Sequence, residues 1–230
     1  MDFKQDILLT VDAVLFGYNR EEGLSVLLIK RRLEPFIHHW ALPGGFVRDK
    51  ESLEDAVLRE LKEEAGVEVN YLEQLFTFGT PDRDPRQRVV SVTYYGLVRP
   101  EGFQIKASSD AEDAAWFNLN KLPTLAFDHG HIIQTALERL RGKVTYEPVG
   151  FELLEPKFPF SDLEKLYMAI LNRDLDRRNF KRKIMKLGVV VELDELASSE
   201  GAGRPGHLYK FDKEKFLNLK KEGFVFDIVI

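Results

Sequence analysis

Three glutamates with helical spacing are the residues of this sequence most suited to chemistry. Glu60, Glu63 and Glu64 stand at positions i, i+3 and i+4, so their carboxylates share one helix face within a single turn. A divalent cation would relieve their mutual repulsion, and hard oxygen ligands of this kind suit Mg²⁺ or Mn²⁺. Such a cation neutralises a diphosphate and helps to generate hydroxide from water. A solvated acidic helix face is the ordinary alternative for a glutamate cluster taken alone.

The segments around these glutamates predict the elements that hold them. A helix is expected over residues 52–64, because Leu53, Val57 and Leu61 form an apolar stripe opposite the glutamates. Gly66 lies just past its end, where a left-handed cap is common. Upstream, the turn Pro43-Gly44-Gly45 lets the backbone approach closely, so the Gly45 carbonyl could become a further ligand.

The spacing of these residues resembles the Nudix box, the signature of the Nudix hydrolase superfamily. Five residues separate Gly45 from Glu51, seven separate Glu51 from Arg59, and the run RELKEEAGV follows, so the match covers 23 residues. The resemblance implies catalytic and magnesium-binding roles for Glu60, Glu63 and Glu64, with a carbonyl contribution from Gly45. It also implies that Arg59 pairs with Glu51 and that Gly66 is structural. Substrates of the superfamily are nucleoside diphosphates linked to another group, and which glutamate acts as the base stays open.

The rest of residues 1–145 mixes strands and helices, which indicates an α+β fold. Aliphatic and β-branched runs predict strands over residues 7–16, 24–29 and 89–98, and an apolar stripe predicts a last helix over residues 128–141. This pattern fits the α/β/α sandwich of the Nudix fold, and we expect a Nudix hydrolase-like domain over residues 1–145.

Three arginines before the strand at 89–98 are candidates for effector or substrate binding. Arg83, Arg86 and Arg88 could make bidentate contacts to phosphate or hydrogen bonds to sugar hydroxyls. A surface turn stabilised by aspartate and proline is an equal alternative. Pro81 follows Gly66 by fifteen residues, a placement similar to that of ADP-ribose-type Nudix members. ADP-ribose or a related sugar nucleotide is therefore the expected ligand.

The charge of the chain changes sign after a proline-marked passage. The 230 residues carry a net charge of −5, but residues 157–230 hold 15 Lys+Arg and 12 Asp+Glu, so the remainder is strongly acidic. Residues 146–160 contain three prolines, which disfavour regular structure. We expect an ordered connector there and a separate basic domain over residues 161–230.

The sequence of the basic domain predicts two helices followed by a hairpin. Ser161 and Glu164 stand at capping-box spacing before a helix over residues 161–172. A second helix over residues 176–187 begins at the cap Asp176 and ends at Gly188. Strand-like runs at 189–193 and 207–211 flank a glycine-rich segment that contains Arg204.

This order is typical of a winged helix-turn-helix, whose second helix enters the major groove of DNA. A solvated cationic face is the alternative, but the hairpin and the change of charge favour DNA binding. The candidate DNA-binding residues are Arg177, Arg178, Asn179, Lys181, Arg182, Lys186 and Arg204.

The two parts together resemble the Nudix-related transcriptional regulators. The quoted segments are FDH at 127–129, RLR at 139–141, LDRRNFKRK at 175–183 and GRP at 203–205. The resemblance implies an N-terminal domain that senses ADP-ribose or a pentose, a C-terminal domain that binds operator DNA as a homodimer, and control of NAD or sugar metabolism. Some members of the family have degenerate boxes and no hydrolysis, whereas the box here is intact.

Two functions of different classes follow. The favoured one is a DNA-binding regulator with a nucleotide or sugar effector and residual hydrolysis; the alternative is a magnesium-dependent Nudix pyrophosphohydrolase. The chain has no cysteine, so a disulfide-built secreted module is excluded. It also has no apolar stretch of the roughly 18–20 residues that a bilayer crossing needs, and no secretory signal pattern. We expect a cytoplasmic protein without a membrane partner.

Overall fold

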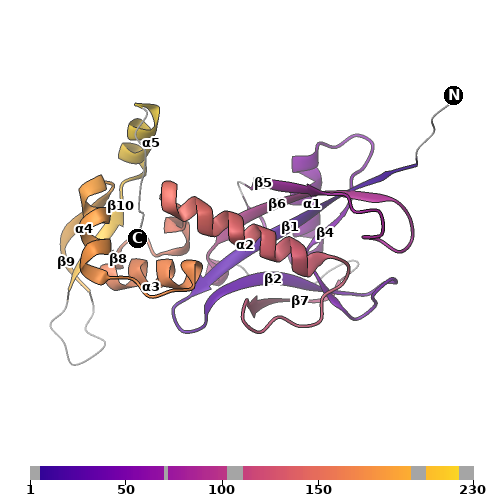
Figure 1. Ribbon diagram of the computed structural model, residues 1–230, viewed down its shortest axis with the longest axis horizontal. Helices are drawn as coiled ribbons and strands as arrows, with labels where there is room; N and C mark the ends of the chain where they lie inside the picture. The colour runs from indigo at the N-terminus through magenta and orange to yellow at the C-terminus, as the bar shows by residue number, and fades with distance from the viewer. Residues whose placement is uncertain (1–5, 70–71, 103–110, 198–205, 223–230) are drawn as a thin grey trace. The chain divides into compact units, whose positions relative to one another are not determined.

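The computed structural model describes residues 6–69, 72–102, 111–197 and 206–222, and its helices and strands are shown in Figure 1. The chain packs as two compact units, Met1–Leu137 and Glu138–Ile230. In the described part of the chain, no helix combines the length and the apolar character needed to cross a membrane.

A seven-stranded mixed sheet forms the first unit. Its strands are β1 (Leu8–Asn19), β2 (Gly23–Arg31), β3 (Trp40–Ala41), β4 (Gly44–Phe46), β5 (Glu73–Phe78), β6 (Val89–Val98) and β7 (Ala111–Asn118). The order is β3-β2-β1-β6-β5, with β7 paired to β2 and β4 paired to β1. β1 runs parallel to β6 and antiparallel to β2 and β4. The sheet and its helices confirm the predicted α+β class and Nudix sandwich.

β1 is the central strand, and its sequence explains why. Every residue from Val11 to Phe16 is buried, as expected for a strand that neighbouring strands and packed elements cover on both faces. β2 pairs with β1 near Phe16 to Asn19, whereas β4 pairs with it at Thr10 to Asp12. Gly44 and Gly45, predicted as part of a turn, therefore belong to a strand that pairs directly with β1.

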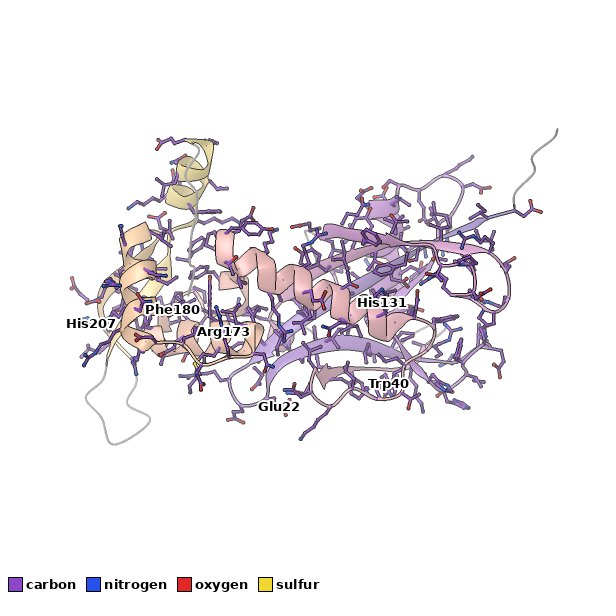
Figure 2. The ribbon with its side chains drawn as sticks, in the orientation of Figure 1. Glu22, Trp40, His131, Arg173, Phe180 and His207 are labelled. Carbon is purple, nitrogen blue, oxygen red and sulfur yellow. The ribbon has the colours of Figure 1, made fainter. Side chains whose placement is uncertain are left out.

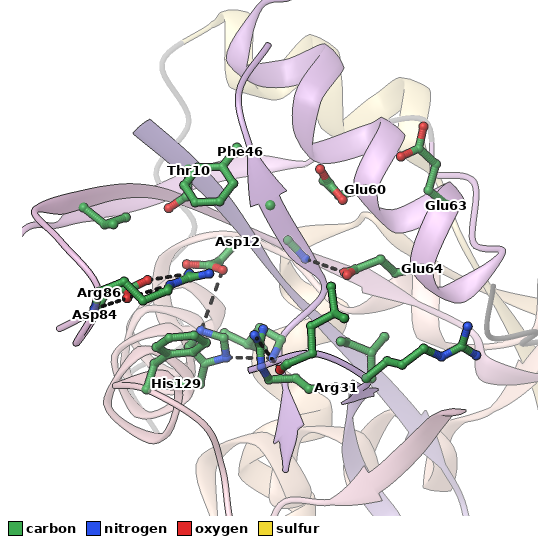
Figure 3. Close-up of a pocket in the computed structure, with 18 of the residues that line it drawn as sticks. Thr10, Asp12, Arg31, Phe46, Glu60, Glu63, Glu64, Asp84, Arg86 and His129 are labelled. Carbon is green, nitrogen blue, oxygen red and sulfur yellow. Dashed lines mark hydrogen bonds and ion pairs between the residues drawn. The ribbon is translucent and has the colours of Figure 1, made fainter. Parts of the chain in front are cut away.

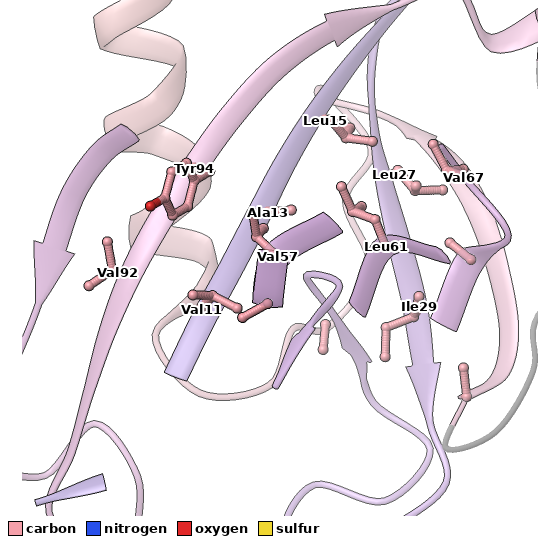
Figure 4. Packing of buried hydrophobic residues seen from close by; sticks show 14 of the residues in the cluster. Val11, Ala13, Leu15, Leu27, Ile29, Val57, Leu61, Val67, Val92 and Tyr94 are labelled. Atoms are coloured by element: carbon pink, nitrogen blue, oxygen red, sulfur yellow. The ribbon is translucent and has the colours of Figure 1, made fainter. Parts of the chain in front are cut away.

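Helix α1 (Leu53–Ala65) carries the three glutamates. The Ser52 side chain accepts a hydrogen bond from the Asp55 amide at its start, and Gly66 ends it with φ 67°. Val57 and Leu61 are buried in the core that β1 and β2 also build, as Figure 4 shows. The predicted helix and its glycine cap are confirmed, and core packing on one side leaves the opposite face to the glutamates.

Helix α2 (His129–Tyr146) extends five residues beyond the predicted end at Arg141. The apolar stripe continues past that point, because Leu140 and the buried Val144 lie four residues apart. Two short helices, η1 (Pro100–Gly102) and η2 (Phe151–Leu153), lie in the segments between longer elements.

The second unit consists of helices packed against a small antiparallel sheet. Its elements are β8 (Phe158–Pro159), α3 (Phe160–Leu171), α4 (Arg177–Leu187), β9 (Val190–Leu196), β10 (His207–Phe211) and α5 (Lys213–Lys221), with strand order β8-β10-β9. This confirms the predicted winged helix. The predicted connector at 146–160 is not free of regular elements, because η2 and β8 lie within it. The predicted limits of the two domains remain a prediction.

The cap predicted at Ser161 is wrong. α3 begins one residue earlier, at Phe160, with Pro159 at the cap position and no side-chain cap. Phe160 is 5% exposed and its ring contacts Phe180 and Tyr209, so tertiary packing draws it into the helix. By contrast, the Asp176 side chain accepts from the Asn179 amide and Gly188 ends α4 with φ 69°, as predicted.

Candidate functional site

The first unit contains a pocket of about 520 Å³ beside the glutamate face of α1. Figure 3 shows carboxylates from α1 on one side of it and the segment that carries Asp84 and Arg86 on the other. β1, β4, the loop before β6 and the start of α2 also contribute to its lining. Acidic and basic side chains thus face the same cavity.

All three predicted glutamates line this pocket. Glu64 is 8% exposed and accepts a 2.8 Å hydrogen bond from the Gly44 amide. Burial raises the pKa of Glu64 to about 8, and burial also raises the pKa of Glu60 above its ordinary value. A carboxylate in this environment gains from any cation that approaches it.

Arg59 supplies one cationic partner. It makes two hydrogen bonds to the Glu51 carboxylate, 2.9 Å from Nε and 2.7 Å from Nη2, as the Nudix resemblance implies. These bonds are the main reason that the pKa of Glu51 falls to about 2. The other terminal nitrogen of Arg59 lies 2.5 Å from Glu60 and 3.2 Å from Glu63. Arg59 therefore orients two of the three carboxylates.

The described side chains include no group of three or more histidines, cysteines, aspartates or glutamates already gathered around a common metal position. The reason lies in the contacts above: Arg59 holds Glu60 and Glu63, while the Gly44 amide holds Glu64. The residues nevertheless fit a divalent cation. Carboxylate oxygens are the ligands that Mg²⁺ prefers, and a Cβ on Gly45 would lie 2.6 Å from the Glu60 carboxyl carbon, so only glycine leaves that space open.

The structure separates the three predicted effector arginines. Arg83 and Arg86 line the pocket, and Arg88 instead lies close to the Gly79 carbonyl, to which it donates at 2.5 Å. Arg83 is buried and pairs with aspartates, whereas Arg86 pairs with Asp84 at 2.7 Å and is 41% exposed. Arg86 is the member of the trio best placed to meet a ligand.

Three further residues line the pocket: Asp12 and Arg31, which were not singled out from the sequence, and His129, which was noted only within the FDH segment of the resemblance. The guanidinium of Arg31 lies 4.8 Å from the centre of the Phe127 ring, and burial lowers its pKa. His129 Nδ1 accepts a 2.8 Å hydrogen bond from the Leu42 amide. An aspartate inside the apolar run ILLTVDAVLF was a visible signal, but no local pattern indicates the other two.

The second unit presents a cationic surface on α4. Arg178, Arg182 and Lys186 are exposed, while Phe180 and Ile184 on the opposite side are buried. Figure 2 shows the side chain of Phe180 on this helix and that of His207 at the start of β10. Among the other candidates, Arg177 lies 3.4 Å from Glu164 and Asn179 accepts from Arg182 at 2.8 Å. Arg204 lies outside the described residues.

The fold and the two surfaces define a protein with a Nudix domain and a winged-helix domain. Family models confirm both parts: the NUDIX domain matches residues 8–136, and the NrtR DNA-binding winged helix domain matches residues 150–211. The chain belongs to the family of Nudix-related transcriptional regulators.

Relatives of this chain include both regulators and an enzyme. It is 35% identical over 208 residues to the ADPR responsive transcriptional repressor NtrR of Acinetobacter baylyi, covering 89% of this chain and 82% of that protein. It is 46% identical over 114 residues to the ADP-ribose pyrophosphatase of Methanocaldococcus jannaschii, covering 50% of this chain and 66% of the enzyme.

Solved structures show the same two-part resemblance. Shewanella oneidensis NrtR complexed with a 27mer DNA has a TM-score of 0.76 at 35% identity, covering 88% of this chain and 93% of that chain. The NUDIX domain of the same protein complexed with ADP ribose has a TM-score of 0.55 at 42% identity, covering 60% and 90%. Nudix hydrolases generally use divalent metal ions, which agrees with the chemistry of the glutamate face.

Proposed function

We propose that this protein is a transcriptional regulator that binds operator DNA through its second unit and ADP-ribose through its Nudix pocket, and that it controls genes of NAD metabolism. The observation that carries the proposal is the presence, in one chain, of a Nudix pocket with acidic and basic walls and of a winged helix with a cationic α4. The whole-length similarity to an ADPR-responsive repressor and to a DNA-bound structure supports it. We expect the protein to act in the cytoplasm.

The charges of the pocket suit a nucleoside diphosphate joined to a sugar. Arg86 and Arg31 can donate to phosphate oxygens, and a guanidinium is well matched to that geometry. Glu60, Glu63 and Glu64, with the Gly45 carbonyl, would hold Mg²⁺ or Mn²⁺. The bound cation would neutralise the diphosphate beside these carboxylates. Arg59 would keep Glu60 and Glu63 oriented through the contacts described above.

In the second unit, α4 would enter the major groove. Arg178, Arg182 and Lys186 project from its exposed face, and Arg177, Asn179 and Arg204 are further candidates from the sequence. A homodimer would place two such helices on two half-sites of an operator. ADP-ribose would shift the protein between DNA-competent and incompetent states if it binds one of them more tightly.

The test of this proposal starts from DNA selected by the protein itself. Purified full-length protein would enrich duplexes from a random-sequence library, and the best duplex would then be challenged with ADP-ribose, NAD and free pentoses. We expect ADP-ribose to change the affinity of the complex and the pentoses to leave it unchanged. Failure of the wild-type protein to enrich any duplex would overturn the proposed function.

The variant that tests the DNA surface is Arg178→Ala combined with Arg182→Ala. Both side chains are exposed, so the change should not unfold α4. We expect loss of binding to the selected duplex, with a weaker salt dependence because phosphate-neutralising cations are removed. Unchanged affinity across salt concentrations would show that α4 is not the DNA-binding element.

Hydrolysis is a second candidate function, favoured by the intact glutamate set on α1 and by the similarity to an ADP-ribose pyrophosphatase. Release of AMP from ADP-ribose in the presence of Mg²⁺ would demonstrate it. Glu63→Gln would be expected to abolish such turnover. Absence of AMP from the wild-type reaction, together with measurable ADP-ribose binding, would leave the pocket as a receptor alone.

A further inference from the structure

Lys181 differs from the other cations of α4 because its ammonium group is directed at the hairpin of β9 and β10. Its Nζ donates a 2.8 Å hydrogen bond to the Tyr209 hydroxyl. The same nitrogen lies 5.1 Å from the centre of the Tyr209 ring and 5.4 Å from that of Phe160. The distance to Phe160 permits a cation–π attraction, whereas Tyr209 contributes through its hydroxyl. Lys181 therefore has two partner residues within its own unit, Tyr209 and Phe160.

Tyr209 connects Lys181 to β9, the other strand of the hairpin. Its side chain is 3% exposed, and its hydroxyl donates a hydrogen bond to the Glu192 carboxylate. Glu192 is the residue directly opposite Tyr209 in the antiparallel pairing of β9 and β10. A chain of polar contacts thus runs from α4 through β10 to β9, and each hydrogen bond in it involves a charged group at one end.

The ladder of the hairpin is irregular beside Tyr209. The register of β10 against β9 shifts between His207 and Tyr209. Such a bulge leaves a strand locally less constrained by its ladder, so side-chain contacts have more influence on its direction. Tyr209 lies at the end of this irregular stretch. Its hydroxyl is hydrogen-bonded to Lys181 of α4 and to Glu192 of β9.

We propose that Lys181, Tyr209 and Glu192 form a helix–hairpin link that fixes the position of the hairpin relative to α4. In this arrangement Lys181 and Tyr209 are positioning residues for DNA recognition and not phosphate ligands. The inference rests on the proposed DNA-binding function. A recognition helix and a wing meet different parts of a duplex, so both fit one sequence only if their relative placement is maintained. The carboxylate of Glu192 also offsets the charge of Lys181 next to the hairpin.

Lys186 provides the matched comparison on the same helix. It is exposed, and it projects from the face that we expect to meet phosphate. Removal of a phosphate-binding cation reduces the slope of log K against log salt by about 0.9, and it weakens binding to all sequences alike. Removal of a positioning contact changes no phosphate contact. It lowers the preference for the selected duplex and leaves the salt slope unchanged.

The experiment uses full-length protein, the duplex that the wild-type chain selects and a scrambled duplex, with affinities measured across salt concentrations. Tyr209→Phe removes only the hydroxyl and retains the buried ring. We expect it to lower affinity for the selected duplex by at least about 3-fold, because it removes both hydrogen bonds of the hydroxyl, to Lys181 and to Glu192, and to leave the scrambled duplex unaffected. Lys181→Met should also keep the wild-type salt slope, whereas Lys186→Met should reduce it.

Two results would overturn the inference while leaving the proposed function intact. One is a Tyr209→Phe protein with wild-type preference for the selected duplex. The other is a Lys181→Met protein whose salt slope falls as much as that of Lys186→Met, since Lys181 would then be a phosphate ligand. A wild-type chain that selects no duplex would overturn both the inference and the proposed function.

Discussion

Arg83 and Asp128 form a bidentate ion pair between the loop that precedes β6 and the start of α2. The distances are 3.1 Å from Nε to Oδ2 and 2.8 Å from Nη2 to Oδ1. The Arg83 side chain is 5% exposed, and its Nη2 also lies 3.5 Å from Asp12 of β1. This arginine thus joins three separate segments at the wall of the pocket. Its donors are directed at aspartates, which favours a structural role over direct ligand contact.

Replacement of Arg83 by methionine should destabilise the first unit. The change leaves Asp12 and Asp128 without their cationic partner, and breaking a buried pair in this way costs about 3–5 kcal/mol. Asp128 is partly exposed, so we expect the lower end of that range. Urea unfolding followed by tryptophan fluorescence measures this unit alone, because Trp40 and Trp116 both lie within it.

Arg86→Met is the control for that measurement. Arg86 pairs with Asp84, only two residues away, and its side chain is 41% exposed. The Asp84 side chain is 5% exposed, but it would still accept the hydrogen bond from the backbone amide of residue 86, so we expect a smaller loss than for Arg83→Met. Equal destabilisation by the two variants would contradict the structural role of Arg83.

Gly45→Ala should weaken Mg²⁺ binding without unfolding the protein. The added Cβ would press on the Glu60 carboxylate and displace it from the glutamate face. Loss of ligand orientation at metal sites typically lowers affinity by about 10- to 100-fold. Calorimetric titration with MgCl₂ measures the effect. Gly130→Ala is the control, since its Cβ would meet only Leu125 Cδ1 at 3.7 Å, and equal affinities in the two variants would exclude the predicted geometry.

The stability of the first unit should fall as the pH drops below about 6.5, in part because of His129. Burial lowers the pKa of this side chain below 6.5, so the folded state resists protonation while the unfolded chain accepts the proton. The contribution is complete above pH 6.5 and is lost as the pH falls toward the folded-state pKa. One proton corresponds to at most about 1.4 kcal/mol per pH unit.

His129→Asn tests this dependence. An asparagine oxygen can still accept the hydrogen bond that the Leu42 amide now donates to Nδ1, but it does not titrate. Unfolding free energies between pH 5 and 7 should therefore vary less steeply in the variant. Parallel curves for the two proteins would show that His129 does not contribute.

Asp176→Ala should loosen α4. The Asp176 carboxylate accepts a 2.8 Å hydrogen bond from the Asn179 amide, and loss of such a cap costs about 1 kcal/mol. Hydrogen exchange of the α4 amides should accelerate by about fivefold. Asp176→Asn retains an acceptor and should stay close to wild type, as should Asp174→Ala, which lies before the cap. Faster exchange in all three variants would indicate a general charge effect instead.

Elements with a strong local pattern were predicted well. The strands at residues 89–98 and 207–211 have the predicted limits, because their β-branched and aromatic residues are bounded by turn residues. β3 and β4 were missed, since two or three residues are too few to show any periodicity. β7, with the sequence AEDAAWFN, was missed because it is poor in β-branched residues and has no clean alternation.

The glutamates of α1 and the exposed cations of α4 were predictable from the sequence, whereas the contacts made by Arg83 and Lys181 were not. Helical periodicity places Glu60, Glu63 and Glu64 on one face and the cations of α4 on another, so the order of residues alone determined both. The partners of Arg83 and Lys181 are 45 and 28 residues away in the chain, and no local spacing relates them. Only the tertiary structure decided that Arg83 is directed at aspartates and Lys181 at the Tyr209 hydroxyl, because a long side chain turns toward whichever carboxylate, hydroxyl or aromatic ring the fold brings within reach.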